Sequence, residues 1–360
     1  MNQFCFGFKS KLFASIFDLL HAVLRLFFPS RFKEPSLKQI QRILLCNWAN
    51  LGDVVLATSV IAALKAQFPG CRIGFLVSKQ SSVVLQTSLG IDWVHETYSW
   101  ARVGTTVLQK VRDFFAYRKK EEKRIVQELT EKNYDVALEL FPFFPNTIAL
   151  AYKAKIPVRI GFNTSGNHLL LTRPVSWKEE GYLPLQYGLL LERLGVQEEY
   201  RKNLKPSIFV KKMVVDEPFV IFHLCSSFAA KEFPLPFWQK LYGLFREAAI
   251  KVVFTGRGER EKKAIESVCL DETGNLCDRL SWNELVSLIQ RSALVVSVDS
   301  VPIHLAAALD VSFIGLYNGN TPHPGIWQPI RENGAIFFEG IDPSAIFEKA
   351  TEQLMHLQKA

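Results

Sequence analysis

The stretch that decides the fold runs from residue 40 to residue 78, IQRILLCNWANLGDVVLATSVIAALKAQFPGCRIGFLVS. Its first part, 40–48, is mostly apolar and has the length of a buried strand. After an NLGD turn, residues 54–68 follow the pattern of a helix, which a Pro-Gly pair ends, and 71–78 is a second apolar run. A strand, a helix and a strand in this order predict a parallel sheet covered by helices on both faces.

The same alternation continues along the chain in two blocks. Further strands are expected at 134–140, 158–162, 218–224, 250–256, 293–299 and 312–318, and helices at 106–131, 236–249, 259–269, 282–291 and 303–309. Between the blocks, 196–217 is polar, weakly periodic and contains a proline, as is typical of a linker. The pattern favours two doubly wound α/β domains in tandem, with the ligand site at the carboxyl ends of their strands, in the cleft between them.

Length and composition agree with two globular domains. The 360 residues are 48% hydrophobic and 22% charged, which excludes a disordered or fibrous chain. The expected parts are an N-terminal amphipathic helix in 1–35, a first domain at 36–205, a second domain at 206–340 and a C-terminal helix at 341–360. The six cysteines contain no C-x-x-C pair, so we expect reduced core thiols in a cytosolic chain rather than disulfides or a zinc ribbon.

The N-terminal helix raises the question of a membrane. Residues 8–28 are strongly apolar, but Asp18, His21 and Arg25 interrupt them, so the segment is a poor transmembrane helix. These polar residues share one narrow stripe of the helix. Such a helix either lies in the membrane interface or packs onto the first domain. A second basic run at 118–124 is interleaved with glutamates and is typical of a solvated helix face.

Charge is distributed unevenly along the chain. Residues 1–205 carry 28 basic and 17 acidic side chains, a net charge of +11, whereas residues 206–360 carry 15 and 18, a net charge of −3. A basic half suits a nucleic acid, an anionic membrane surface or an anionic substrate. The basic residues do not interleave with aromatic residues in a recognisable module, so no nucleic acid is expected as a partner.

Two of the loops that join a predicted strand to a helix carry candidate anion-binding groups. In the first, Asn50 to Asp53, Gly52 permits a tight turn and Asp53 falls in the first turn of a helix, either as a functional carboxylate or as a helix cap. The second, 223–231, contains Ser226, Ser227 and Lys231. Hydroxyls and an ammonium group suit a diphosphate, although a polar surface loop has the same composition.

Two further loops lie at predicted strand ends in the second block. Residues 255–260 contain a G-x-G that precedes Glu259 and lacks the third glycine of a dinucleotide fingerprint. In the other loop, Asp299 and Ser300 form a short turn, and Pro302 begins a helix where its missing N–H costs nothing. His304 falls in the first turn of that helix, either as a core histidine or beside a phosphate bound by the helix start.

Together these motifs resemble a known family. NLGDVVLATSVIAALKAQFP, RIGF at 159–162, the Ser227 to Lys231 spacing followed by Phe-Pro, and VDSVPIHLAAAL at 298–309 occur in the order found in bacterial heptosyltransferases of glycosyltransferase family nine. The resemblance implies a GT-B fold, in which two Rossmann-like domains face each other across a cleft. It also implies that the first domain binds the acceptor and the second the nucleotide sugar.

The resemblance carries roles to the matching positions. Asp53 is similar to the general base of the family, and Asn50 and Gly52 belong to the acceptor-side loop. The donor-binding residues that it implies are Ser226, Ser227, Lys231, Glu259, Asp299, Ser300, Val301 and His304. The family usually has glycine where this chain has Val301, and a β-branched side chain there would crowd a diphosphate.

The implied activity is transfer of a heptose, with inversion, from ADP-heptose to an anionic lipopolysaccharide core, in the cytoplasm or at the inner face of the cytoplasmic membrane. No cofactor is expected. The chain has no D-x-D sequence for a metal, so Lys231 and a helix dipole are expected to neutralise the leaving diphosphate. Two alternatives stay open: another GT-B enzyme of sugar nucleotides, such as an epimerase, and a catalytically silent protein whose donor site Val301 has closed.

Overall fold

The computed structural model describes residues 40–98, 106–143, 145–164, 167–178, 181–210, 217–269, 272–321, 324–330 and 332–359. The amphipathic helix predicted at 8–28 lies outside these residues. The described chain divides into two compact units, one within residues 40–178 and 183–207, the other within residues 181–182 and 208–359. Within the described residues, no helix is both long enough and apolar enough to cross a membrane.

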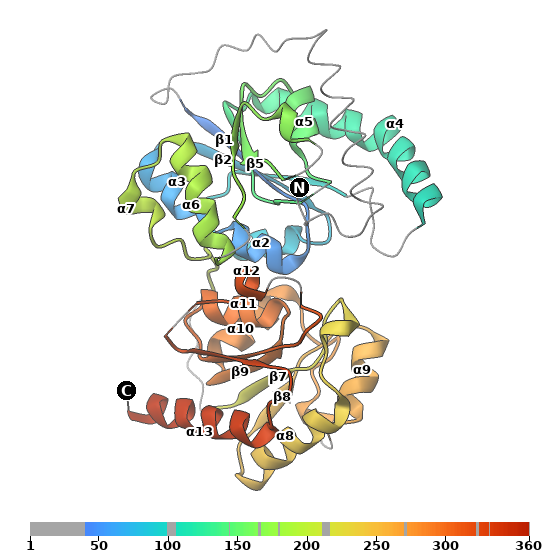
Figure 1. The fold of residues 1–360 in the computed structure, drawn as a ribbon, viewed down its shortest axis with the longest axis vertical. Coiled ribbons are helices and arrows are strands. Elements are labelled where there is room, and N and C mark those ends of the chain that lie inside the picture. Colours follow the sequence, from blue (N-terminus) through green and yellow to red (C-terminus); the bar gives the residue numbers. More distant parts are fainter. Residues whose placement is uncertain are drawn as a thin grey trace. The chain divides into compact units, whose positions relative to one another are not determined.

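The first unit is built on a six-stranded, wholly parallel sheet in the order β3-β2-β1-β4-β5-β6 (Figure 1). Its strands are β1 (Arg42–Asn47), β2 (Arg72–Ser78), β3 (Trp93–Thr97), β4 (Val136–Glu139), β5 (Val158–Phe162) and β6 (Arg173–Val175). Its helices are α2 (Leu51–Ala57), α3 (Val60–Gln67), α4 (Val107–Lys132), α5 (Ile148–Lys153), α6 (Leu183–Leu194) and α7 (Glu198–Arg201), with 3-10 turns η2 (Ser82–Thr87) and η3 (His168–Leu170).

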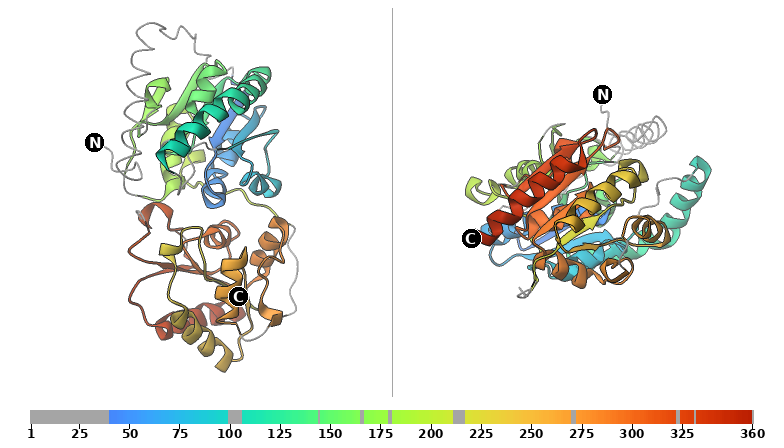
Figure 2. Two further views of the ribbon diagram at one scale, coloured as in Figure 1. Left: turned by 90° about the vertical axis from the view of Figure 1, so that its right-hand side faces the viewer. Right: turned by 90° about the horizontal axis from the view of Figure 1, so that it is seen from below.

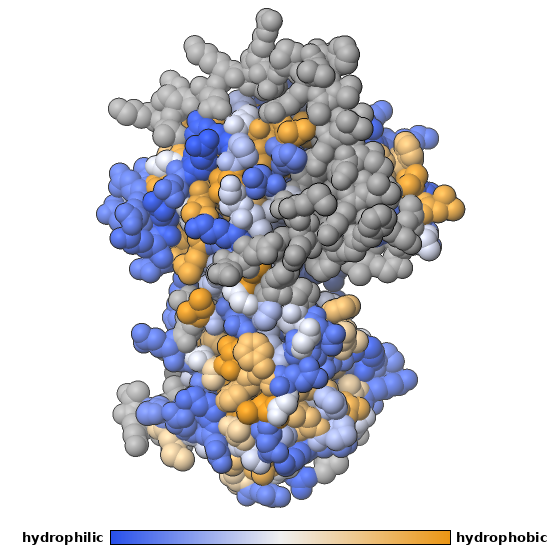
Figure 3. All heavy atoms as spheres, viewed as in Figure 1, coloured by the Kyte–Doolittle hydropathy of each residue, from blue (hydrophilic) through white to orange (hydrophobic). Residues whose placement is uncertain are grey.

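Apolar side chains on both faces of the first sheet explain its two helical layers. Leu44 and Cys46 of β1 belong to a buried cluster with Ile125 and Leu129 of α4, whereas α2, α3, α6 and α7 contact one another on the other face (Figure 1). The beginning of α4 is different, because Leu108 there stays exposed. Hydrophobic atoms are visible beside hydrophilic ones where α4 lies in Figure 3.

The second unit is built on a five-stranded parallel sheet in the order β11-β10-β9-β7-β8. Its strands are β7 (Val220–His223), β8 (Val252–Phe254), β9 (Leu294–Val298), β10 (Phe313–Tyr317) and β11 (Gly334–Phe338). Its helices are α8 (Leu235–Glu247), α9 (Glu259–Glu266), α10 (Trp282–Arg291), α11 (Val301–Ala308), α12 (Pro324–Trp327) and α13 (Pro343–Lys359), with 3-10 turns η4 (Ala229–Lys231) and η5 (Glu272–Gly274). Its main core, around Phe222 and Trp238, lies between the sheet and the pair α8 and α13.

The structure differs from the sequence prediction at two places in the first unit. The NLGD sequence is not a separate turn, because Asn50 is the N-cap of α2 and Gly52 is helical. The helix predicted at 54–68 is two helices, α2 and α3. They separate at Thr58, whose hydroxyl donates to the Val55 carbonyl (2.7 Å), a local bond that competes with the backbone bonds of a helix.

The expected linker at 196–217 is also partly wrong. Its beginning contains α7 and the buried side chains of Val196 and Leu204, so these residues belong to the first unit. The polar pattern there reflects the solvated side of a short surface helix rather than a connection. Residues 211–216 of the expected linker lie outside the described chain.

Candidate functional site

In the second unit, the loops after β7 and β9 diverge. The strand order places β8 on one side of β7 and β9 with β10 on the other, so the direction of the crossovers reverses between β7 and β9. In open α/β sheets a crevice for ligands forms at the carboxyl ends of the strands where this reversal occurs. Lys231 lies in the loop after β7, and Asp299 and Ser300 directly follow β9. These predicted donor-side residues therefore lie at the switch point.

An ion pair joins the two loops at this switch point. The Lys231 Nζ lies 2.6 Å from Asp299 Oδ2, and their side chains are 19% and 5% exposed. The Ser226 hydroxyl donates to the Asp299 carbonyl over 3.4 Å. The structure therefore brings three of the predicted residues together, with the ammonium group more accessible than the carboxylate that holds it.

The start of α11 supplies fewer amides than a typical helix N-terminus. Ser300 is the extended N-cap, and Val301 is the half-buried first residue. Pro302 has no N–H, and the Ile303 N–H donates to the Ser300 carbonyl (3.3 Å). Among the first three residues of α11, Val301 is therefore the one whose amide is available to an anion, so an anion bound at this helix start would depend more on Lys231 than on backbone N–H groups.

His304 is buried below this helix start. The residue is 5% exposed, and its Nδ1 has no hydrogen-bond partner in the part of the chain that the structure describes. Burial lowers the pKa of His304 to about 4; the Asp299 carboxylate opposes this shift and the Lys231 ammonium adds to it. The imidazole is therefore neutral near pH 7, with a buried ring nitrogen that a ligand or water would satisfy.

We expect the contribution of His304 to the free energy of unfolding to fall as the pH is lowered from 6.5 towards 4. Unfolded His304 takes up a proton near its ordinary pKa of 6.5, whereas the folded protein resists protonation until about pH 4. The stabilising contribution is complete above pH 6.5 and is lost through this window. Urea unfolding of the parent and of His304→Gln tests it, because the variant should lose less stability between these pH values. Equal slopes would contradict the prediction.

Residues outside the predicted site hold the loop after β7 in place. Glu232 Oε1 accepts the Ser226 N–H (2.8 Å), and Arg260 binds both oxygens of Glu232 (2.7 and 2.8 Å). Arg260 also donates to the Ser226 carbonyl (2.8 Å), and the Asn318 amide donates to the Ala230 carbonyl (2.9 Å). Glu232 and Arg260 each directly follow a residue that the sequence singled out, but nothing in the sequence shows that they pair.

The remaining donor-side predictions are less closely connected to the pair. Ser227 is exposed, and Glu259, the first residue of α9, forms a 3.5 Å pair with Lys263 on the surface of its own helix. Tyr317, which the sequence did not single out, is fully buried at the end of β10. Its hydroxyl has no hydrogen-bond partner among the described residues, and burial raises its pKa, with the Asp299 carboxylate adding to the effect.

In the first unit, Asp53 lies at the corresponding place. The strand order reverses between β1 and β4, and α2 begins directly after β1. Asp53 is the third residue of α2, and its Oδ2 accepts the Asn50 N–H over 3.2 Å, so the aspartate does cap the helix. The Trp48 indole donates to the Pro145 carbonyl (2.9 Å) and thus joins the loops after β1 and β4. The hydrogen bond from Asn50 holds the Asp53 carboxylate in position. Because Asp53 is only half-buried, solvent still reaches it.

Glu139, at the end of β4, is a buried carboxyl group that the sequence did not reveal. Its oxygens accept the Phe141 N–H (3.1 Å), the Thr147 N–H (2.7 Å) and the Thr147 hydroxyl (2.6 Å). Burial outweighs these bonds and raises the pKa of Glu139 to about 8. The group fixes both ends of the loop after β4, beside the switch point of the first unit.

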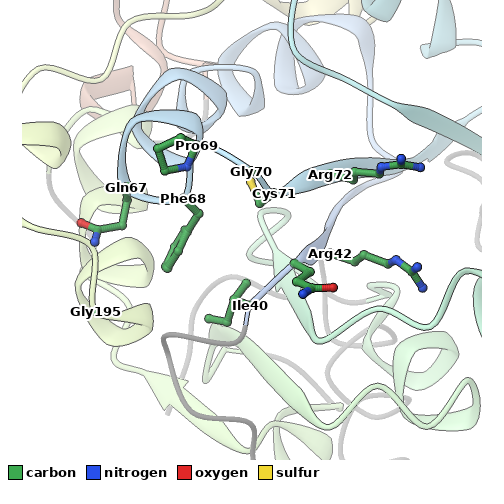
Figure 4. A pocket seen from close by; sticks show the side chains of 10 residues that line it. Ile40, Arg42, Gln67, Phe68, Pro69, Gly70, Cys71, Arg72 and Gly195 are labelled. Atoms are coloured by element: carbon green, nitrogen blue, oxygen red, sulfur yellow. The ribbon is translucent and has the colours of Figure 1, made fainter.

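A cavity of about 760 Å³ lies at the opposite, amino-terminal edge of the first sheet (Figure 4). Arg42, Gln67, Cys71 and Arg72 are among the residues that line it, and none of the predicted site residues is. Its arginines have partners elsewhere, since Arg42 donates to the Lys132 carbonyl (3.0 Å) and Arg72 lies over the Trp93 ring.

The side chains that the structure describes include no group of three or more His, Cys, Asp or Glu that could hold a metal ion.

The chain is similar to known heptosyltransferases in sequence and in fold. The model of glycosyltransferase family 9 (heptosyltransferase) matches residues 123–356. Lipopolysaccharide heptosyltransferase 3 of Escherichia coli K12 is 23% identical over 316 residues, which cover 80% of this chain and 85% of that protein. The structure of E. coli ADP-heptose lps heptosyltransferase II has a TM-score of 0.70 at 18% identity, covering 89% of this chain and 100% of that one. That of E. coli heptosyltransferase WaaC with ADP also has a TM-score of 0.70 at 18% identity, covering 87% and 100%. These likenesses confirm the predicted α/β GT-B fold class.

Proposed function

The chain belongs to glycosyltransferase family 9, and from this premise we propose that it transfers a heptose from ADP-heptose to an anionic lipopolysaccharide core, with inversion and without a metal ion. The observation that carries the proposal is the ion pair of Lys231 and Asp299 at the switch point of the second unit, beside the buried His304. The names of similar proteins support the donor and the acceptor, since one is a lipopolysaccharide heptosyltransferase and another was solved with ADP.

In this mechanism the acceptor hydroxyl attacks the anomeric carbon of the donor from the side opposite the diphosphate. A bond forms between the acceptor oxygen and that carbon, and the carbon–oxygen bond to the diphosphate breaks with its electron pair staying on ADP. Asp53 takes the hydroxyl proton. Lys231 and the Val301 amide stabilise the negative charge that develops on the leaving diphosphate. In other transferases a bound metal ion stabilises this charge.

The charge of the chain supports an anionic acceptor. Residues 1–205 have a net charge of +11, which attracts a phosphate-bearing core oligosaccharide. Because this acceptor is attached to a lipid, we place the enzyme in the cytoplasm, at the periphery of the inner membrane. The donor is the nucleotide sugar, and no nucleic acid takes part.

We expect the purified protein to add the mass of one heptose to a heptose-free core lipid when it is given ADP-heptose. The reaction should continue in the presence of a chelator, and the product linkage should have the anomeric configuration opposite to that of the donor. Calorimetric titration with ADP, UDP and GDP checks the nucleotide, with ADP binding most tightly. If the protein used another nucleotide sugar and not ADP-heptose, the proposed donor would be wrong. If it transferred no sugar from any activated donor, a catalytically silent binding protein would be favoured.

A further inference from the structure

The first turns of α4, before Phe114, extend beyond the core that the rest of the helix helps to form. The helix has 26 residues, about 39 Å at roughly 1.5 Å per residue. Its buried side chains are Tyr117, Ile125 and Leu129. From Leu108 to Ala116 no described side chain is buried. Figures 1 and 2 show this end of α4 projecting past the other described elements of its unit.

One stripe of this helix carries both apolar and basic side chains. Leu108, Arg112, Phe115, Lys119 and Lys123 follow one another at steps of four, three, four and four residues, so they share one face of the helix. All five are exposed, and Leu108 and Phe115 are 79% and 63% exposed. We call these five residues the α4 stripe. Water is a poor environment for its two large apolar side chains.

The positive charge of α4 is not neutralised along its length. The glutamates nearby have other partners: Glu121 and Glu128 pair with Arg124 (2.6 and 2.8 Å), and Glu122 pairs with Lys153 (2.6 Å). Within the described chain, five basic side chains of α4 have no ion-pair partner, namely Lys110, Arg112, Lys119, Lys120 and Lys123. The stripe therefore presents an excess of cations beside exposed apolar groups.

We propose that the α4 stripe binds the surface of an anionic lipid bilayer. Leu108 and Phe115 enter the boundary between headgroups and acyl chains, and Arg112, Lys119 and Lys123 lie against lipid phosphates. A helix with apolar and basic groups on one exposed face has the chemistry of an interfacial helix. Each cation near such a surface strengthens binding about fivefold. The proposal does not depend on the transfer reaction, because it concerns binding to lipid alone.

Co-sedimentation of the full-length protein with vesicles tests this surface. One set of vesicles contains equal parts of phosphatidylglycerol and phosphatidylcholine, and the other contains phosphatidylcholine alone; neither contains saccharide. We expect the parent to sediment with the anionic vesicles only, and high salt to release it. Leu108→Ser with Phe115→Ser should weaken binding at least roughly tenfold, and Arg112→Gln with Lys119→Gln and Lys123→Gln by a similar factor or more.

A matched control removes one apolar and one basic exposed residue elsewhere in the same unit. Leu185→Ser with Lys202→Gln changes α6 and the residue after α7, which lie across the unit from α4 in Figure 1. This control should bind like the parent. All variants keep residues 1–39, so that segment contributes equally to each, and thermal melting confirms that they fold.

Several results would overturn the proposal. The parent could stay in the supernatant with anionic vesicles, both stripe variants could bind as the parent does, or the control could lose as much binding as they do. Loss of binding in the charge variant alone would also overturn it, because the stripe would then attract anions without entering a bilayer.

Discussion

Asp53→Asn is expected to bind the donor as the parent does and to turn over more slowly by roughly two to four orders of magnitude, the range that a general base contributes. The substitution keeps the shape of the side chain and removes its ability to take a proton. The new amide oxygen can still accept the Asn50 N–H, so the start of α2 is retained. Donor affinity should be unchanged because the proposed diphosphate-binding groups belong to the second unit. The measurement is kcat on ADP-heptose together with calorimetric donor affinity.

Asp135→Asn is the matched control for this prediction. The Asp135 Oδ2 accepts the backbone N–H groups of Gln41 and Arg42, both over 2.8 Å, at the amino-terminal edge of β1. Losing its charge should lower stability a little and leave kcat unchanged, because that edge is opposite the switch point. A near-normal kcat in Asp53→Asn would remove the assigned base, whereas equal losses in both variants would point to stability.

Local sequence patterns predicted the sheets of both units because each element carries its own signal. Buried strands such as 158–162 are short apolar runs, and α10 begins at a capping Ser281 with a glutamate three residues later. The edge strands β3, β6 and β11 were missed. β3 alternates exposed and buried residues and contains a histidine and a glutamate, and β6 has three residues with a proline in the middle. Edge strands of this kind lack the apolar run that identifies a central strand.

The candidate site could be predicted only residue by residue. The sequence and the family resemblance singled out Lys231 and Asp299, but these residues are 68 positions apart, and their 2.6 Å contact depends on β7 and β9 being neighbours. Strand order is a property of the whole sheet. The sequence did not reveal the ion pair of Glu232 and Arg260 for the same reason. In the sequence alone, each residue has the pattern of a solvated surface charge, and only the fold brings the two together.

Lys231→Met should weaken donor binding roughly 100-fold and lower kcat by roughly 10²- to 10³-fold, the loss typical for one group that stabilises developing charge. Two effects combine. The diphosphate loses its cation, and the Asp299 carboxylate, 5% exposed, is left without its partner beside an anionic ligand. Lys240→Met is the control, because the Lys240 pair with Asp342 has side chains 54% and 58% exposed, and such pairs contribute little.

The double variant Lys231→Met with Asp299→Asn separates these two effects. Removing the carboxylate charge should restore part of the donor affinity and of the stability lost in the single variant, because no unpaired buried charge remains. It should not restore kcat, since the leaving diphosphate still lacks the ammonium group that stabilises it. Donor titration, thermal melting and kcat measured on the same preparations distinguish these outcomes. A double variant that turns over like the parent would show that Lys231 only balances Asp299, and the charge of the departing ADP would then have to be stabilised by another group.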